Sequence, residues 1–351
     1  MALHDIVGHE ALRERLNQSI AADRFPQASL LVGPQGIGKQ RLALWLGQTI
    51  LCDDRQRSGP CGQCPACRRS LNLAHPDLHW FVPIPRPKAT EPSKQIDEAD
   101  SLLGETLEGR RAQPLWGRPD GTFSHSIASI RLLQRRVSLT PVMARKKVVI
   151  IGDAERLVVQ EASPEAANAL LKLLEEPPSD TYVMLTAADP QALLPTVRSR
   201  LVPIRVQRLT DDQVGGFLEQ RGVGTATTRS RQALLAEGSI GRALAATDGA
   251  EAADKAADRF LDALKGGAVK SALAAMAQPP WSARGEFTAM LDGVAVRLRA
   301  RVAEAPHQDR RILRRYAEAL RKVEAARFDA QGNLNPQLSL AVLAQELRTL
   351  V

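Results

Sequence analysis

The chain has 351 residues, of which 44% are hydrophobic, 25% charged and only 4% aromatic. This length gives room for two or three domains with a sizeable core, and the composition is that of an ordinary globular protein that favours helices over a β-sandwich. No apolar run reaches the ~20 residues that span a bilayer. Because Met1–Asp5 begins no secretory signal, we expect a cytoplasmic protein without membrane contact. The net charge of +8 suits work near nucleic acid but does not establish DNA binding.

Short apolar strands alternate with helical patterns through the first part of the chain. An amphipathic helix over residues 1–25 is followed by a strand, a glycine-rich turn and a second helix. Because buried strands that alternate with helices form parallel sheets covered on both faces, the sequence predicts an α/β domain with a five-stranded parallel sheet. The predicted strands are residues 30–32, 77–82, 147–151, 182–186 and 202–206.

Composition changes along the chain predict its domain organisation. We expect an α/β domain over residues 1–206, with a cysteine module at about 51–80 and an irregular, mobile insertion at about 83–122. Six prolines interrupt that polar insertion, which has a short helix-compatible piece at 96–107. Ser163-Pro164 is a strong helix start. After residue 206 the strands disappear, which predicts a small helical unit over 207–248 and a helical domain over 249–351.

The segment Gly33-Pro34-Gln35-Gly36-Ile37-Gly38-Lys39-Gln40 matches the G-x-x-x-x-G-K core of a phosphate-binding loop, or P-loop. Its glycines let backbone N–H groups converge on phosphate oxygens, and Lys39 adds a positive charge. Gln40 replaces the usual Ser or Thr, whose hydroxyl holds Mg²⁺. The strand before the loop and the helix after it favour a P-loop fold over a ligand-free turn, and they leave open whether ATP or ADP binds.

A second apolar strand, Val148–Ile151, leads through Gly152 to Asp153, which is a Walker-B pattern in which the Asp orients Mg²⁺. A working ATPase of this kind usually has Glu next, but here Ala154 follows, which argues against hydrolysis. Glu155 comes one residue late, and on a strand-like segment this shift would point it to the other face. The alternative is a strand end with a capping Asp.

The cysteines predict a metal site. All four lie within sixteen positions, and in a reducing cytoplasm such clustering indicates metal rather than disulfides: Cys52, Cys61, Cys64 and Cys67. Four thiolates suit tetrahedral Zn²⁺ and leave no open position, so the site is expected to be structural. An iron–sulfur cluster or unligated thiols are the alternatives. His75 and His79 are interpreted as bystanders.

Together these segments are similar to the bacterial clamp-loader ATPase family, in which a P-loop precedes a four-cysteine module in one domain. Further matches are residues 168–178, Ser199-Arg200 and, near the end of the chain, residues 333–338. The resemblance covers most of residues 1–248 and implies an AAA+ domain over 1–206, a lid over 207–248 and a collar for oligomerisation over 249–351.

The resemblance also gives Arg200 a role. In the family's Ser-Arg-Cys motif, the Arg reaches ATP bound in the neighbouring subunit and stabilises charge on the γ-phosphate as an arginine finger in trans. Ser199 and Arg200 match this motif, whereas Leu201 replaces the Cys, which is not the chemical group. Without the family, the basic residues of this segment would be interpreted as a solvated loop.

Three differences separate this chain from the family's motor subunits, which resemble Gly-Lys-Thr, Asp-Glu and Gly-Ser-x-Arg. The corresponding residues here are Lys39-Gln40, Asp153-Ala154 and Gly238-Ser239-Ile240-Gly241, with Arg242 displaced by one position. The sequence therefore predicts a non-motor, delta-prime-like subunit whose own ATPase is absent or weak. The resemblance implies a hetero-pentamer with gamma/tau and delta subunits that loads the sliding clamp on primed DNA. That complex is part of the DNA polymerase III holoenzyme, a nucleotidyltransferase, and this chain has no polymerase site.

Two other functions remain open from the sequence. The first is an active gamma/tau-like clamp-loader ATPase, against which Gln40 and Ala154 argue. The second is a zinc-containing DNA-binding protein, although the cysteine spacing lacks the histidines and recognition helix of a C₂H₂ finger. The many arginines after residue 296 are interpreted as solvated helix faces and ion pairs, with DNA contact as the less favoured view.

Overall fold

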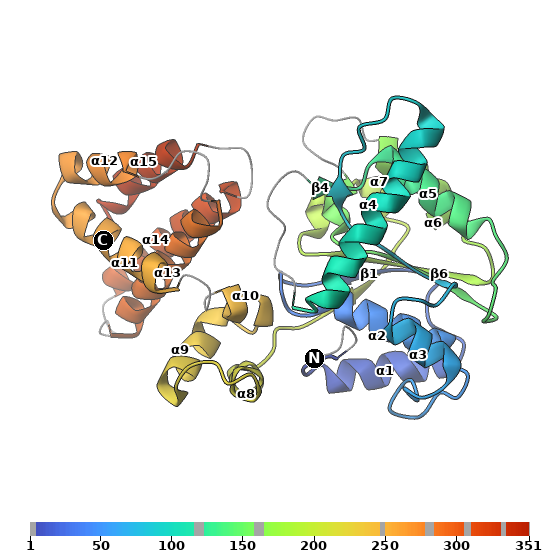
Figure 1. Ribbon diagram of the computed structural model, residues 1–351. Helices are drawn as coiled ribbons and strands as arrows, with labels where there is room; N and C mark the ends of the chain where they lie inside the picture. The colour runs from blue at the N-terminus through green and yellow to red at the C-terminus, as the bar shows by residue number, and fades with distance from the viewer. Residues whose placement is uncertain are drawn as a thin grey trace. The chain divides into compact units, whose positions relative to one another are not determined.

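The computed structural model describes residues 5–115, 123–157, 165–245, 250–277, 284–304, 310–330 and 335–350. The chain divides into two compact units, Met1–Arg242 and Ala243–Val351, and their boundary falls inside helix α10 (Ile240–Ala245). Figure 1 shows the sheet in the first of these units, while the described part of the second is helical. The predicted helix start at Ser163-Pro164 lies outside the described residues; α6 is described from Glu165.

The first unit is built on a five-stranded sheet in the order β2-β5-β6-β1-β7, and every pair of neighbours is parallel. This confirms the predicted parallel sheet. The central strands β5 and β6 are buried along their whole length, as a parallel sheet covered on both faces requires. The strands are β1 (Ala28–Val32), β2 (Leu78–Phe81), β5 (Lys147–Ile151), β6 (Thr181–Ala187) and β7 (Val202–Arg205).

The register brings the carboxyl ends of three strands to one edge of the sheet. Val32 at the end of β1 pairs with Ala187 at the end of β6, and Ile151 at the end of β5 pairs with Leu185. Because parallel strands all end on the same side, the segments that follow β1 and β5 emerge at the same edge of the sheet, on either side of β6. The glycine-rich loop and Asp153 therefore lie at the same edge.

Helices cover the two faces of this sheet. Figure 1 shows α1 (Glu10–Ala21), α2 (Lys39–Leu51) and α3 (Pro65–Leu71) on one side of it. On the other side are α4 (Pro92–Ala112), α5 (Ile127–Val137) and α6 (Glu165–Glu175). Helix α2 packs directly against β5 and β6, and its inward side chains, which include Leu42 and Leu46, are fully buried. The glycine-rich loop is thus held between a central strand and a buried helix.

The described part of the predicted irregular insertion, residues 83–115, contains a long helix; residues 116–122 lie outside the described residues. β3 (Ile84–Pro85) pairs with β4 (Phe123–Ser124) in a separate antiparallel ladder, and α4 between them is 21 residues long. Pro92 stands in the first turn of α4, where a missing N–H is tolerated, and the other described prolines flank the helix. The buried Ala99 and Leu103 lie one turn apart and pack on the core. The prolines therefore bound a helix and do not interrupt it.

Short elements complete the first unit. Two 3₁₀ turns, η1 (Ala154–Leu157) and η2 (Pro190–Ala192), follow β5 and β6, and α7 (Pro195–Arg198) precedes β7. After the sheet, α8 (Asp211–Gln220) packs against α9 (Ala226–Ala236). Thr210 and Gln213 form a reciprocal capping box that fixes the start of α8.

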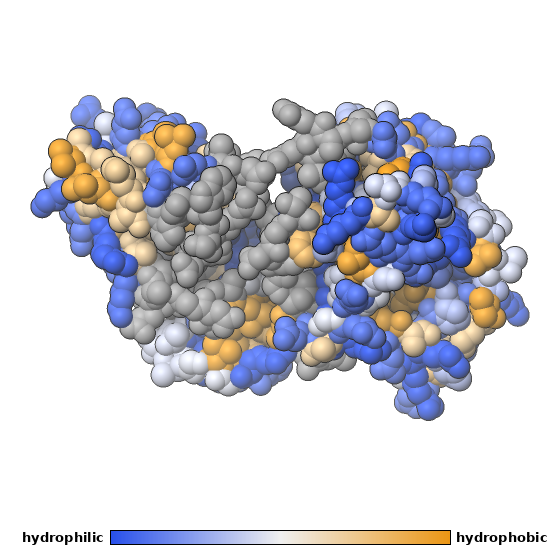
Figure 2. All heavy atoms as spheres, turned by 45° about the horizontal axis from the view of Figure 1, so that its top comes forward, coloured by the Kyte–Doolittle hydropathy of each residue, from blue (hydrophilic) through white to orange (hydrophobic). Residues whose placement is uncertain are grey.

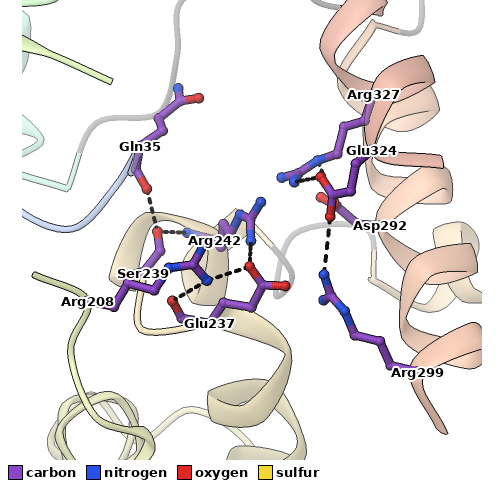
Figure 3. Close-up of polar contacts among 9 residues, drawn as sticks. All are labelled: Gln35, Arg208, Glu237, Ser239, Arg242, Asp292, Arg299, Glu324 and Arg327. Atoms are coloured by element: carbon purple, nitrogen blue, oxygen red, sulfur yellow. Dashed lines mark hydrogen bonds and ion pairs between the residues drawn. The ribbon is translucent and has the colours of Figure 1, made fainter. Parts of the chain in front are cut away.

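The second unit consists of helices throughout its described residues: α11 (Ala250–Lys265), α12 (Ala268–Met276), α13 (Arg284–Glu304), α14 (Arg310–Asp329) and α15 (Pro336–Leu347). Its core contains Phe260, Phe287 and Leu340 among other buried apolar side chains. Several arginines form ion pairs within the unit; Glu324 lies 3.1 Å from Arg299 and 3.3 Å from Arg327 (Figure 3). Among the described residues, none of the helices has the length and hydrophobicity needed to cross a membrane.

Asp77, just before β2, fixes the loop that leads into β5. Its buried carboxylate accepts hydrogen bonds from the backbone N–H groups of Val142, Met143 and Ala144 at 2.6–2.8 Å. Burial raises the pKa of Asp77, but these three donors outweigh it and hold the pKa below its ordinary value. The charged form of Asp77 is therefore the one that stabilises the fold.

We expect Asp77→Ala to lower the free energy of unfolding by about 2–4 kcal/mol, because three buried N–H groups lose a charged acceptor. Since the folded-state pKa is depressed, this stabilisation is present at neutral pH and disappears as the pH falls through that pKa. Urea denaturation at several pH values measures both effects. The control, Asp97→Ala, removes an exposed carboxylate 3.6 Å from Arg135 and should change stability by less than about 0.5 kcal/mol. Equal losses for the two variants would contradict the assignment.

Candidate nucleotide and metal sites

The predicted P-loop joins β1 to α2 and has the backbone that its glycines allow. Gly36 and Gly38 adopt left-handed φ values of 77° and 97°. Lys39 is buried, and its Nζ donates to the carbonyl oxygens of Gly33 and Pro34, each at 2.8 Å. Burial lowers the pKa of Lys39, whereas the nearby charges of Glu155 and then Asp153 raise it. The lysine thus lies inside the loop, within reach of two carboxylates.

Residues 239–241 pack directly on this loop. Ser239 Oγ donates to the carbonyl oxygen of Gln35 at 2.8 Å, and the N–H of Gly241 donates to the carbonyl oxygen of Gly36 at 3.0 Å. Figure 3 shows the first of these contacts. A Cβ on Gly36 would lie only 2.4 Å from Ser239 Oγ. The start of α10 and the P-loop therefore pack backbone against backbone, with no room for a side chain at Gly36.

Gly241, predicted at the sensor-2 position, has no side chain to offer a nucleotide. The following residue, Arg242, is held elsewhere: it lies 2.7 Å from Glu237, and Arg208 lies at the same distance from the same carboxylate oxygen (Figure 3). A carboxylate shared by two guanidinium groups anchors both of them. The arginine displaced by one position is thus part of a local ion-pair network.

At the end of β5, the residue that faces Gln40 is Gly152. A Cβ at Gly152 would meet Gln40 Oε1 at 2.6 Å. A side chain at position 152 would therefore point at position 40, where P-loop ATPases have the hydroxyl residue that helps to hold Mg²⁺. The predicted Walker-B residue, Asp153, is one position later. It turns away from the strand with φ of 51°, and its N–H donates to Thr186 Oγ1 at 3.0 Å. The strand position opposite Gln40 therefore carries no carboxylate.

Glu155 does not point away from the site as the strand pattern predicted. Residues 154–157 form the 3₁₀ turn η1, so the alternation of a strand does not apply to them. Glu155 Oε1 accepts from the N–H of Ala188 at 3.2 Å, and burial followed by the charge of Asp153 raises the pKa of Glu155. Ala154 is fully buried and has no polar group to contribute. The site thus contains a second carboxylate, which the sequence interpretation placed on the other face.

Two further residues of this site were missed in the sequence. Arg110, near the end of α4, donates from Nη1 to Gln40 Oε1 at 2.9 Å. His125, just before α5, bonds from Nε2 to the carbonyl oxygen of Gly152 at 2.7 Å, and burial lowers its pKa to about 4, so the neutral ring donates. Arg110 continues the helical spacing of the apolar residues of α4, which is a signal that could have found it. A single histidine before a helix gives no such signal.

The four cysteines meet at one point. Their Sγ atoms all lie within 4.8 Å of one another, and the closest pairs, Cys52–Cys64 and Cys61–Cys67, are 3.9 Å apart. In a tetrahedral ZnS₄ centre with bonds of about 2.3 Å, sulfur atoms are about 3.8 Å apart, and the Cys52–Cys64 and Cys61–Cys67 pairs come near this spacing. These residues could therefore hold a metal ion such as zinc.

Backbone donors point at three sulfur atoms of the cluster. The N–H groups of Cys61, Cys64 and Cys67 lie 3.3–3.4 Å from the sulfur atoms that accept from them. Donors from Gln63 and then Cys64 lower the pKa of Cys61 to about 7, whereas burial raises the pKa of Cys52 and of Cys67. Cys52 directly follows α2, whose other end begins at the P-loop residue Lys39, so one buried helix connects both predicted sites.

Arg200 lies in the loop between α7 and β7, with Ser199 and away from the predicted P-loop and cysteine residues. Its Nε donates to Glu175 Oε1 at 2.8 Å, Nη2 pairs with the same oxygen, and Nη1 donates to the carbonyl oxygen of Thr196 at 2.7 Å. The side chain is still 31% exposed. Ser199 Oγ donates to the same carbonyl oxygen, at 3.2 Å. The two residues of the predicted finger motif thus share an anchor at Thr196.

The parallel sheet covered by helices, the glycine-rich loop after β1 and the helices that follow the sheet define an α/β protein with a helical C-terminal part. A family model described as DNA polymerase III, delta subunit matches residues 8–210. Because the match covers more than half of the chain, the chain belongs to this family, and two of the curated relatives it matches are delta-prime subunits.

The delta-prime subunit of Pseudomonas aeruginosa is 33% identical over 175 residues, which are 50% of this chain and 41% of that protein. The delta-prime subunit of Bacillus subtilis is 30% identical over 214 residues, 61% of this chain and 52% of that protein. This chain therefore spans about half the length of these relatives. Among solved structures, it is similar to a DNA polymerase III gamma subunit-related protein of Thermotoga maritima, with 16% identity, coverage of 96% and 98%, and a TM-score of 0.44. That likeness is too loose to bear on function.

The packing of α10 on the P-loop predicts unequal effects for two glycine substitutions. In Gly36→Ala, the new Cβ would meet Ser239 Oγ at 2.4 Å and the Gly241 Cα at 2.9 Å, in addition to the strain of a positive φ. In Gly38→Ala only the strain applies, because nothing lies within 4 Å. We expect Gly36→Ala to destabilise by about 1–3 kcal/mol more than Gly38→Ala, measured by urea denaturation. If the two variants are equally stable, the close contact is wrong.

Proposed function

We propose that this chain is the non-motor, delta-prime-type subunit of a DNA polymerase III clamp loader, which lends Arg200 to ATP bound by a neighbouring subunit. The observation that carries the proposal is the contrast between two sites. The chain's own P-loop site has Gln40, Ala154 and Gly241 where motor subunits have a hydroxyl, a catalytic carboxylate and an arginine. Arg200 and Ser199, by comparison, are present and partly exposed.

The arrangement of Arg200 supports a role outside its own subunit. The side chain is positioned by Glu175 at the end of α6 and by Thr196, and neither belongs to the chain's P-loop site. Both Arg200 and Glu175 are partly exposed, so the pair is reachable by a neighbouring molecule and is screened by solvent. A phosphate oxygen carrying more charge than a carboxylate oxygen can replace Glu175 as the acceptor. Glu175 would then hold the finger ready until a nucleotide approaches.

The second unit supports assembly with other subunits. Five apolar side chains on the adjacent helices α12 and α15 are more than half exposed: Val269, Leu273, Met276, Leu338 and Val342. Figure 2 shows an apolar (orange) surface over these helices at its upper left. Such a patch is typical of a protein interface. We assign the AAA+ domain to residues 1–206, the lid to 207–248 and the oligomerising collar to 249–351, within a cytoplasmic hetero-pentamer with gamma/tau and delta subunits. The sliding clamp and primed DNA would be bound through that complex.

Arg200→Ala is expected to reduce clamp-dependent ATP hydrolysis at the receiving site of the reconstituted complex by about 10³-fold, because the charge on the γ-phosphate loses a guanidinium. Arg200→Lys should recover little, since an ammonium lacks the planar fork. The measurement is ATPase and clamp-loading rates with motor subunits, clamp and primed DNA. Arg198→Ala is the matched control, because this arginine ends α7 two residues before Arg200 and contacts Gln191. Unchanged rates with Arg200→Ala would refute the finger.

We also propose that the cysteine cluster holds one structural zinc ion. The four sulfur atoms converge, the backbone donates to three of them, and four thiolates leave a tetrahedral ion no position for substrate. The ion would fix the end of α2 to α3, whose first residue follows Cys64. It would therefore stabilise the helix that begins at the P-loop.

Elemental analysis of the purified chain should find about one zinc per molecule, and Cys61→Ser should lose it and lower the melting temperature by several degrees. Ser58→Ala, an exposed change within the same module, should keep both the zinc and the melting temperature. Absence of zinc from the wild-type protein, or iron with sulfide in its place, would overturn the assignment.

A further inference from the structure

Three elements meet at one point of the P-loop site. Gln40 belongs to the first turn of α2, Gly152 follows β5, and Arg110 lies at the end of α4. Gln40 Oε1 accepts from Arg110 Nη1 at 2.9 Å and lies against Gly152, 2.6 Å from where a Cβ would stand. In P-loop ATPases, the side chain at the position of Gln40 and a carboxylate at the strand end hold Mg²⁺ between them. Here, a guanidinium group is bonded to Gln40 at that place.

Arg110 is a fixed and buried cation. Only 6% of the residue is exposed, and its guanidinium carbon lies 5.0 Å from the centre of the Trp80 ring in β2. Burial lowers the pKa of Arg110 to about 10, while the charge of Asp153 opposes this shift, so the side chain is charged at neutral pH. A buried charge without compensation is strongly unfavourable. The aromatic face, the amide oxygen and the nearby carboxylate supply that compensation.

The P-loop site contains its own cations and carboxylates. The charges of Glu155 and Asp153 act on Lys39, and the charge of Asp153 also acts on Arg110. Asp153, Arg110 and Arg156 all act on the pKa of His125, whose Nε2 bonds to the carbonyl oxygen of Gly152. A divalent ion entering this space would meet a fixed positive charge and a glycine where ATPases have a ligand. It would therefore be repelled.

We infer that Arg110 is a built-in cation of this P-loop site, standing where P-loop ATPases hold their divalent metal, and that it excludes Mg²⁺ from the site. Arg110 has this role only if residues 33–40 are the degenerate nucleotide site of the proposed function, but the role is independent of the finger at Arg200. Helix α4 (residues 92–112) is accordingly part of the site, because it carries the guanidinium group of Arg110.

Binding of Mn²⁺ alone to the zinc-replete chain tests this role, with the electron paramagnetic resonance signal of free Mn²⁺ as the readout. The wild type should show no detectable Mn²⁺ binding at this site, whereas Arg110→Met should bind Mn²⁺ with an affinity at least about tenfold above the weakest that the assay can detect. Methionine keeps an apolar stem on Trp80 but removes the charge. The new binding should disappear in Arg110→Met with Asp153→Asn. Arg110→Lys, which keeps the charge, should exclude Mn²⁺ as the wild type does.

Two outcomes would overturn the inference. One is Mn²⁺ binding by the wild type that is lost in Asp153→Asn, and this comparison decides the question even where Arg110→Met does not fold. The other is a folded Arg110→Met, with unchanged zinc content and circular dichroism, that gains no Mn²⁺ binding. Neither measurement involves a neighbouring subunit, so failure here leaves the Arg200 experiment unaffected, and the reverse also holds.

Discussion

The parallel pairing of β1, β6 and β5 is the constraint on which the sites of the first unit depend. Because these strands are parallel, the backbone after Val32 and the backbone after Ile151 leave the sheet at the same edge, on either side of β6. The loop of glycines, Lys39 and the Asp153 turn therefore lie at that edge. A shift of one residue in the pairing would turn each of these groups to the opposite face.

Electrostatic balance explains why this edge of the sheet is stable although it buries several charges. Lys39 donates to its own loop, Glu155 accepts from Ala188, and Arg110 lies between an indole ring and an amide oxygen. Each charge thus has polar or aromatic partners inside the protein, which is the condition for burying it. A site with its own internal cations and carboxylates is suited to a subunit that serves as a rigid partner.

The two units have different relations to solvent. The first keeps its apolar side chains around the sheet and exposes Arg200 on a loop anchored to α6. The second buries one side of its helices in its own core and leaves an apolar surface on α12 and α15 uncovered.

The sequence by itself determined the five strands and their parallel pairing, the glycine-rich loop and the four-cysteine cluster. These features rest on local patterns: apolar runs of strand length, glycines at fixed spacing, and thiols close together in the chain. It also identified the residues missing from the motor motifs, because a motif is read position by position. The helical nature of the second unit followed from its Ala- and Leu-rich composition, which the described residues confirm.

Only the tertiary structure decided which side chains face each other at the P-loop. The prolines around α4 suggested an irregular segment, but burial of Ala99 and Leu103 holds a helix between them. The strand alternation assumed for Glu155 failed because the chain turns at Asp153 with a positive φ. Arg110 stands 70 positions from Gln40 in the chain, so no local pattern could pair them. Contacts of this kind depend on how helices cover the sheet, and that is set by packing of the whole core.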